Sequence, residues 1–228
     1  MINSDIPKVI NTTKSSARIR NSLEAIARNV GTAIKSTTLI QDMHEFIGAE
    51  KNIPSEPTLI SYMDTLERLM ILEPLPAWTP RMRSKVGLRQ TSHLYFVDPS
   101  LAVVALKKKP DDLLKDLGAL GFLFESLVVR DLRVFAGKLR GRTYFYGNYD
   151  DDEIDVIIDL GGQKWGAVEI KLNPIKSETA ADNINRIIKK IDTDKVGSPA
   201  FKIVVTGYGN AKLIKDDVYQ VPISFLGP

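Results

Sequence analysis

Two short patterns in the second half of the sequence carry groups suited to metal-assisted chemistry. Glu153 and Asp155 are separated by one residue, and so are Glu169 and Lys171. In a β-strand, side chains two positions apart share a face, so each pair would project together. Carboxylate oxygens are preferred ligands of Mg²⁺, and a neighbouring lysine can orient or deprotonate the attacking water and stabilise a charged phosphoryl group. The residue types therefore predict phosphodiester hydrolysis, with Asp155 and Glu169 on Mg²⁺ and Lys171 beside the water.

A glycine pair connects the two patterns. Gly161 and Gly162 lie between two β-rich runs, which indicates a hairpin. A hairpin closed at this pair would set Asp155 and Glu169 at similar heights on neighbouring strands. Two adjacent carboxylates repel each other unless a cation lies between them. The alternative is a solvent-exposed ladder in which one of these carboxylates pairs with Lys171 and no metal takes part.

A fourth carboxylate, Glu125, lies in the apolar helix that we expect over Leu113–Ala136. A carboxylate on a largely buried helix needs a partner, because an isolated buried charge is costly. The metal or Lys171 would supply that partner. A structural ion pair with Arg130 or Arg133 is the alternative.

The elements that would position these groups alternate between helix and strand. Gly118 and Gly121 are expected to break the long helix near its start. A further helix is expected over Thr179–Asp192, before the last strand. The predicted strands are Thr143–Tyr146, Glu153–Leu160, Trp165–Leu172 and Phe201–Thr206. This order predicts a mixed sheet covered by helices over residues 110–228, and therefore an α/β (mixed α+β) fold.

The first half has the order of a winged helix, which is three helices followed by two strands. Helices are expected over Ala17–Val30, from Ser36 and from about Ser55, and strands over Ile71–Trp78 and His93–Val97. The segment KKKPDD after Leu106 is charged and contains proline, so we place a boundary between domains of residues 1–109 and 110–228.

Four basic residues cluster in the loop between the two expected strands, namely Arg81, Arg83, Lys85 and Arg89. Such a cluster can bind the phosphates of DNA, so these residues are the predicted DNA contacts. The alternatives are a solvated surface, a wing that packs on its neighbour, and a protein-interaction module.

Composition excludes several classes of site. The 228 residues include no cysteine, so disulfides and thiolate metal sites are impossible, and the net charge is only +3. No apolar run reaches the length of a membrane span, and the first residues lack the apolar core of a signal peptide. We therefore expect a cytoplasmic protein without a membrane partner. Asp150–Asp152 is expected to form a solvated turn.

Several motifs together resemble a known family. SHLYFVDPSLAVVAL, GFLFESLVVRDL, EIDVIIDL and AVEIKL are similar to a C-terminal domain of unknown function found in many prokaryotic AAA+ ATPases, and SLEAIARNVGT and PTLISYMDTLERLMILE resemble the helical part of that module. In that family an ATPase domain precedes a winged-helix segment and a PD-(D/E)xK nuclease-like domain. The resemblance implies that Glu125, Asp155, Glu169 and Lys171 occupy the nuclease-like positions.

The Walker motifs of the ATPase domain are missing from this sequence, so we expect no ATP binding by these residues. The opening residues resemble a linker, which favours an ATPase domain in cis in a longer protein. Two hypotheses follow: a DNA-binding, Mg²⁺-dependent nuclease-like module, and a non-catalytic DNA- or protein-binding module that serves the ATPase. A transcription regulator built on the winged helix is a third, which leaves the second half without a task. The number of chains that assemble stays open.

Overall fold

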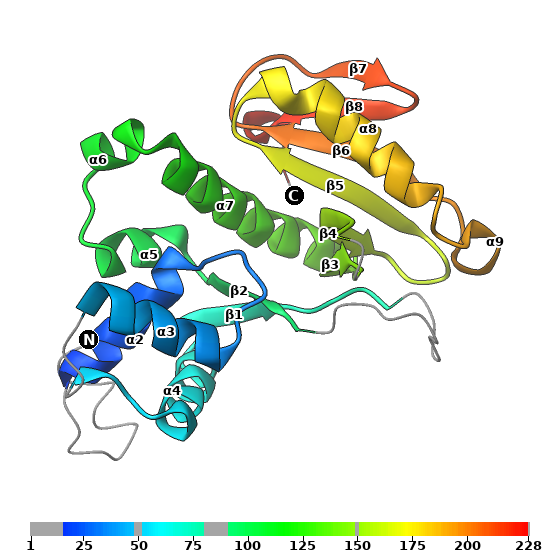
Figure 1. The fold of residues 1–228 in the computed structure, drawn as a ribbon. Helices are drawn as coiled ribbons and strands as arrows, with labels where there is room; N and C mark the ends of the chain where they lie inside the picture. The colour runs from blue at the N-terminus through cyan, green and yellow to red at the C-terminus, as the bar shows by residue number, and fades with distance from the viewer. Residues whose placement is uncertain (1–15, 48–51, 80–90, 149–150, 228) are drawn as a thin grey trace. The chain divides into compact units, whose positions relative to one another are not determined.

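A computed structural model describes residues 16–47, 52–79, 91–148 and 151–227 of the protein (Figure 1). The chain forms two compact units. The first comprises Met1–Pro74 and Thr91–Ser126, and the second comprises Leu75–Gln90 and Leu127–Pro228. The predicted mixed α/β fold class is confirmed, with a six-stranded mixed sheet in the second unit. The domain boundary after Lys109 stays a prediction.

The first unit begins with three helices and a strand pair, in the predicted order. Each helix buries one apolar face; on the first helix that face includes Ile19, Leu23 and Ile26. The elements are α2 (Ser16–Arg28), α3 (Ser36–Ile47), α4 (Glu56–Arg68), β1 (Leu72–Leu75) and β2 (His93–Phe96), and the two strands form a two-stranded sheet. The winged-helix assignment itself stays a prediction.

Three further helices follow, and here one expectation was wrong. They are α5 (Pro99–Ala105), α6 (Pro110–Lys115) and α7 (Leu117–Lys138). Gly118 and Gly121 do not break α7, which runs through both. A helical glycine costs only about 1 kcal/mol, which packing of the apolar neighbours can offset. The interruption falls instead at Asp116, whose Oδ1 accepts a hydrogen bond from the backbone N–H of Ala119 at 3.0 Å.

The second unit is built on a mixed sheet with the strand order β3-β4-β5-β6-β8-β7. β4 pairs antiparallel with β3 and β5, β6 lies parallel to β5 and β8, and β7 is antiparallel to β8. The strands are β3 (Arg142–Gly147), β4 (Glu153–Asp159), β5 (Trp165–Lys171), β6 (Phe201–Thr206), β7 (Lys212–Lys215) and β8 (Val218–Pro222). The four predicted strands are present, while β7 and β8 were not predicted.

Helix α8 (Ser177–Ile188) connects the parallel strands β5 and β6 and lies along one face of the sheet (Figure 1). Its buried residues Ala181, Ile184 and Ile187 recur at helical spacing and join the core that includes Ile157 and Ala167 of the sheet. This packing fixes the rotation of α8 about its axis, and therefore which of its polar side chains reach the strands. The short helix α9 (Thr193–Val196) follows.

None of the helices formed by the described residues combines the length and the apolar composition that a bilayer crossing requires.

Candidate functional site

Three of the predicted site residues converge at one end of the β4–β5 hairpin. The strand register pairs Val156 with Val168, and continuing it by one step sets Asp155 opposite Glu169. The Nζ atom of Lys171 lies 3.2 Å from Oδ2 of Asp155 and 2.7 Å from Oε2 of Glu169. We refer to Asp155, Glu169 and Lys171 as the acid–lysine cluster.

The turn of the hairpin sets this register. β4 ends at Asp159 and β5 begins at Trp165, and between them Gly161 and Gly162 adopt left-handed backbone angles, with φ of 75° and 58°. Glycine populates this region without the steric cost that a Cβ atom imposes. Because side chains alternate between faces along a strand, a shift of the register by one residue would move a carboxylate to the opposite face.

The three side chains differ in exposure. The side chain of Glu169 is 3% exposed, that of Asp155 15% and that of Lys171 29%. Both oxygens of Glu169 are held, since Oε1 accepts a hydrogen bond from Nδ2 of Asn183 at 2.8 Å. Oδ2 of Asp155 also accepts the backbone N–H of Ile170 at 2.7 Å, whereas its Oδ1 accepts no hydrogen bond from the described residues. Hydrogen bonds therefore hold the cluster in place, and Oδ1 of Asp155 can still accept a further one.

The environment shifts the protonation equilibria of the cluster. Burial, followed by the negative charge of Asp155, raises the pKa of Glu169 to about 8, against the opposing effect of Lys171. For Lys171, burial disfavours the charged form, but the two carboxylates outweigh it and the pKa is raised. Lys171 therefore stays protonated at neutral pH. Of the two roles considered for it, this favours donating hydrogen bonds and positive charge over removing a proton from water.

Side chains from α8 extend the cluster. Nδ2 of Asn183 also donates to the backbone oxygen of Glu153 at 3.0 Å, and its Oδ1 accepts a hydrogen bond from Nη2 of Arg186 at 2.6 Å. Because a guanidinium can only donate, the contact with Arg186 fixes which end of the Asn183 amide faces Glu169. Nη1 of Arg186 in turn donates to Asp152. A continuous chain of hydrogen bonds thus links Glu169 to Asp152.

Asp152 itself differs from expectation, because it is buried rather than solvated. Nζ of Lys190 lies 2.6 Å from its Oδ2, and Nδ2 of Asn148 donates to the same oxygen at 3.0 Å. Hydrogen bonds from Lys190 and Arg186 hold the pKa of Asp152 well below its usual range, in spite of its burial. The sequence offered no local signal for this ion-pair cluster, since its cations lie more than thirty residues further along the chain.

Glu125 lies on α7, in the part of the chain that belongs to the first unit. Its Oε1 accepts a hydrogen bond from Oη of the buried Tyr95 at 2.7 Å. The same oxygen would lie 3.0 Å from a Cβ atom added at Gly31, so the backbone packs closely around it. Glu125 thus has a partner within the first unit, and its membership in the acid–lysine site stays a prediction.

The predicted DNA contacts Arg81, Arg83, Lys85 and Arg89 lie outside the described residues. Their role stays a prediction.

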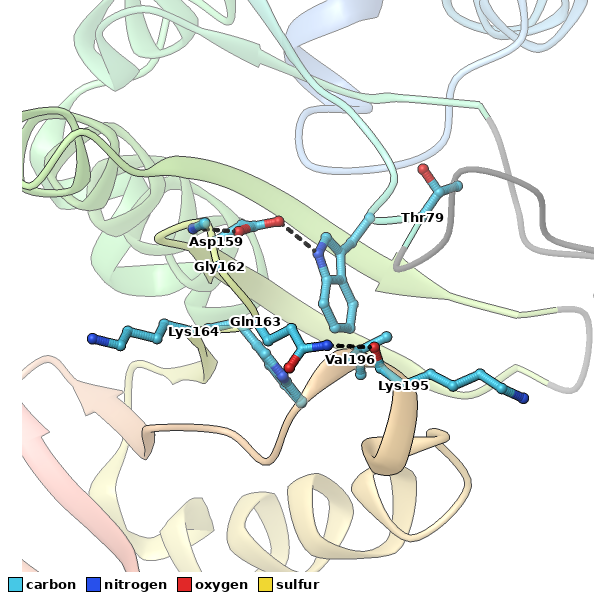
Figure 2. Close-up of a pocket in the computed structure, with 10 residues that line it drawn as sticks. Thr79, Asp159, Gly162, Gln163, Lys164, Lys195 and Val196 are labelled. Carbon is cyan, nitrogen blue, oxygen red and sulfur yellow. Dashed lines mark hydrogen bonds between the residues drawn. The ribbon is translucent and has the colours of Figure 1, made fainter.

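A pocket of about 310 Å³ lies at the other end of the hairpin (Figure 2). It is lined in part by the indole rings of Trp78 and Trp165, whose centroids are 4.7 Å apart. Nε1 of Trp78 donates to Oδ2 of Asp159 at 3.2 Å, and Nε2 of Gln163 donates to the backbone oxygen of Lys195 at 3.2 Å. Trp78 and Gln163 are therefore already paired within the protein, and none of the predicted site residues lines the pocket.

The acid–lysine cluster can be tested as a metal site by its donor set. Within the described part of the chain, no three acidic or histidine side chains are placed to share a metal ion. Mg²⁺, however, binds through one or two carboxylates and completes its coordination with water and substrate phosphate. Asp155 and Glu169 fit that requirement. Lys171 is now shared by both carboxylates, so a bound metal ion would replace it as the counter-charge of at least one of them.

Two family models match this chain. Residues 1–112 match a domain of unknown function (DUF8612), and residues 120–226 match another domain of unknown function (DUF4143). No curated protein and no solved structure matches the chain. The domain matched by residues 120–226 is typically found at the C-terminus of AAA-type ATPases, as the sequence motifs predicted. Each half of the chain is therefore similar to a domain of unknown function, and the second half is similar to a type associated with the C-terminal regions of AAA-type ATPases.

Proposed function

We propose that the second unit is the C-terminal module of an AAA-type ATPase and that its acid–lysine cluster hydrolyses phosphodiester bonds with Mg²⁺. The observation that carries this proposal is the convergence of Asp155, Glu169 and Lys171 from two neighbouring strands within hydrogen-bonding distance. An acidic residue on one strand and an E-x-K pattern on the next is the arrangement that the resemblance to PD-(D/E)xK domains implies. DNA would be the substrate, with the basic segment of Arg81 and Arg83 as a contact.

Each residue of the cluster has a role that follows from its contacts. Asp155 is oriented by the backbone N–H of Ile170, and Glu169 by Asn183, so both ligands would be in place before a cation arrives. Mg²⁺, when bound, would polarise a phosphoryl oxygen and lower the pKa of a water molecule. The protonated amine of Lys171 would donate a hydrogen bond to the phosphate and stabilise the negative charge that develops there.

A non-catalytic module is the second candidate, and a specific observation favours it. Lys171 bonds to both carboxylates, and the side chain of Glu169 is almost completely buried. Such an ion-paired cluster can fix the hairpin without a metal ion. In that case the chain would bind DNA or a protein on behalf of the ATPase and would cut nothing.

Cleavage assays on the full chain separate the two candidates. Supercoiled plasmid and labelled linear DNA would be incubated with Mg²⁺ or Mn²⁺ and either wild type, Lys171→Gln or Asp155→Asn. Lys215→Gln is the matched control, because Lys215 is a half-exposed lysine paired with Asp182 away from the cluster. We expect cleavage by wild type and the control, and a loss of at least about a hundredfold in both cluster variants.

Equal cleavage by wild type and Lys171→Gln would refute the mechanism. Titration of Mn²⁺ by calorimetry gives a second readout that needs no substrate. If wild type neither cuts DNA nor binds Mn²⁺ more tightly than Asp155→Asn, the non-catalytic module is the correct description.

A further inference from the structure

Arg186 and Lys190 share a single carboxylate, which leaves an excess of positive charge beside α8. Both cations contact Asp152, whose side chain is only 4% exposed. The side chains of Arg186 and Lys190 are 50% and 48% exposed. A guanidinium has five N–H donors and an ammonium three, so one carboxylate cannot use them all. The two cations therefore keep donors and one unbalanced positive charge at the surface.

This charge lies next to the acid–lysine cluster. Arg186 donates to Oδ1 of Asn183, and Nδ2 of the same amide donates to Glu169. One amide group and two hydrogen bonds therefore separate the guanidinium from the buried glutamate. The packed face of α8 holds Arg186 in this position relative to the cluster, and Lys190 follows two residues after the end of the helix.

We propose that Arg186 and Lys190 form a phosphate-binding site for a polynucleotide, next to the acid–lysine cluster. The site would hold a backbone phosphate beside the one that is cut, and this second part of the inference rests on the proposed nuclease function. Arginine binds phosphate through two parallel hydrogen bonds, and lysine adds a compact charge. Asp151 and Glu153 flank Asp152 in the sequence. Because their carboxylates repel a phosphate, the gain in affinity for the polynucleotide will be modest.

The competing explanation is that buried Asp152 needs both cations for stability. Charge balance argues against it, because one carboxylate needs one cation, and Asn148 supplies a further hydrogen bond to Asp152. Removing Lys190 would therefore leave Asp152 paired with Arg186. This makes Lys190→Gln a variant that should fold normally and lose the excess charge.

Fluorescence anisotropy with a short labelled DNA duplex, in buffer with EDTA so that nothing is cut, tests the inference. The full-length chain would be compared as wild type, Lys190→Gln, Lys190→Arg and the control Lys215→Gln. Lys215 has the same exposure as Lys190 and also pairs with one aspartate, Asp182. Lys190→Gln should weaken binding about fivefold and make the salt dependence of log K shallower by about 1. Lys190→Arg should restore both, and Lys215→Gln should change neither.

The outcomes distinguish this inference from the nuclease proposal. If Lys190→Gln binds like wild type, or loses no more than Lys215→Gln, the phosphate site is refuted even where wild type cleaves DNA. Failure of wild type to bind DNA at all would also refute it. Binding that depends on Lys190 together with no cleavage in Mg²⁺ or Mn²⁺ would support the phosphate site and reject hydrolysis. A melting curve of each variant shows whether an affinity change comes from misfolding.

Discussion

Two buried carboxylates in the second unit, Glu169 and Asp152, have pKa values that are shifted in opposite directions. Burial raises the pKa of Glu169 to about 8, whereas the pKa of Asp152 lies well below its usual range. Two cations, Arg186 and Lys190, contact Asp152. Glu169, by contrast, shares the single cation Lys171 with Asp155. Burial disfavours the charged form of both groups, but at Asp152 the hydrogen bonds from Lys190 and Arg186 outweigh it, whereas at Glu169 the contact with Lys171 does not. The structural ion pair has a surplus of positive charge, and the candidate site has a deficit.

The largest effect is expected from removing the single cation of the candidate site. Lys171→Met leaves Asp155 and Glu169 side by side without a counter-charge. We expect the free energy of unfolding to fall by about 3 kcal/mol at neutral pH, because breaking a buried pair leaves an uncompensated charge. Urea denaturation followed by circular dichroism measures it. If this variant is as stable as wild type, the cluster contributes no net electrostatic stabilisation.

The dependence of stability on pH provides the next test. The pKa of Glu169 is raised in the folded state, so its contribution to stability is complete below its unfolded pKa and is lost as the pH rises through about 8. Between about pH 6 and pH 8 this loss amounts to about 2 kcal/mol. Glu169→Gln should flatten the curve in that interval. For Asp152 the lowered pKa gives the reverse sign, with stability lost only in acid.

Denaturation at several pH values compares wild type with Glu169→Gln, and Glu178→Gln, an exposed glutamate on α8, is the control. An equally steep curve for Glu169→Gln would show that another group titrates in this interval.

A smaller effect is expected from the amide that joins the two carboxylates. Asn183→Leu removes the hydrogen bonds to Glu169 and to the backbone oxygen of Glu153, and the one from Arg186. We expect a loss of about 1 kcal/mol, typical of a buried hydrogen bond. A double-mutant cycle with Glu169→Gln measures the coupling between the two residues, and full additivity of the two changes would show that the amide does not position the glutamate.

The smallest effect concerns the surplus cation. Lys190→Met should change the free energy of unfolding by about 0.5 kcal/mol or less, because Arg186 still balances Asp152. Measured beside Lys171→Met, it tests the comparison directly. Similar losses in the two variants would mean that the count of cations per carboxylate does not explain the difference between the sites.

Local patterns carried most of what could be predicted. Asp155, Glu169 and Lys171 follow from the two-residue period of strands and from a glycine turn, both of which involve near neighbours in the sequence. Asn183 and Arg186 could not be found in this way, because their contacts with the strands depend on how α8 rotates against the sheet. Glu125 shows the same limit, since its partner Tyr95 lies on another element thirty residues away.

There is also a physical reason why β7 and β8 were not predicted from the sequence. β7 has four residues and β8 five, and β7 lies at the edge of the sheet, where it is largely exposed. The four residues of β7, KLIK, are too few to show an alternating apolar pattern that would predict a strand. Its place depends on pairing with β8, which in turn depends on the parallel contact with β6.

The turn at Gly161 and Gly162 bears on how this domain can vary between relatives. A Cβ atom added at either glycine would meet nothing within 4 Å, so space does not restrict these positions, and asparagine can adopt their backbone angles at modest cost. An insertion or deletion of one residue, by contrast, would turn one strand over relative to the other and separate Asp155 from Lys171. Homologues that keep the chemistry should therefore conserve the length of this loop more strictly than its composition.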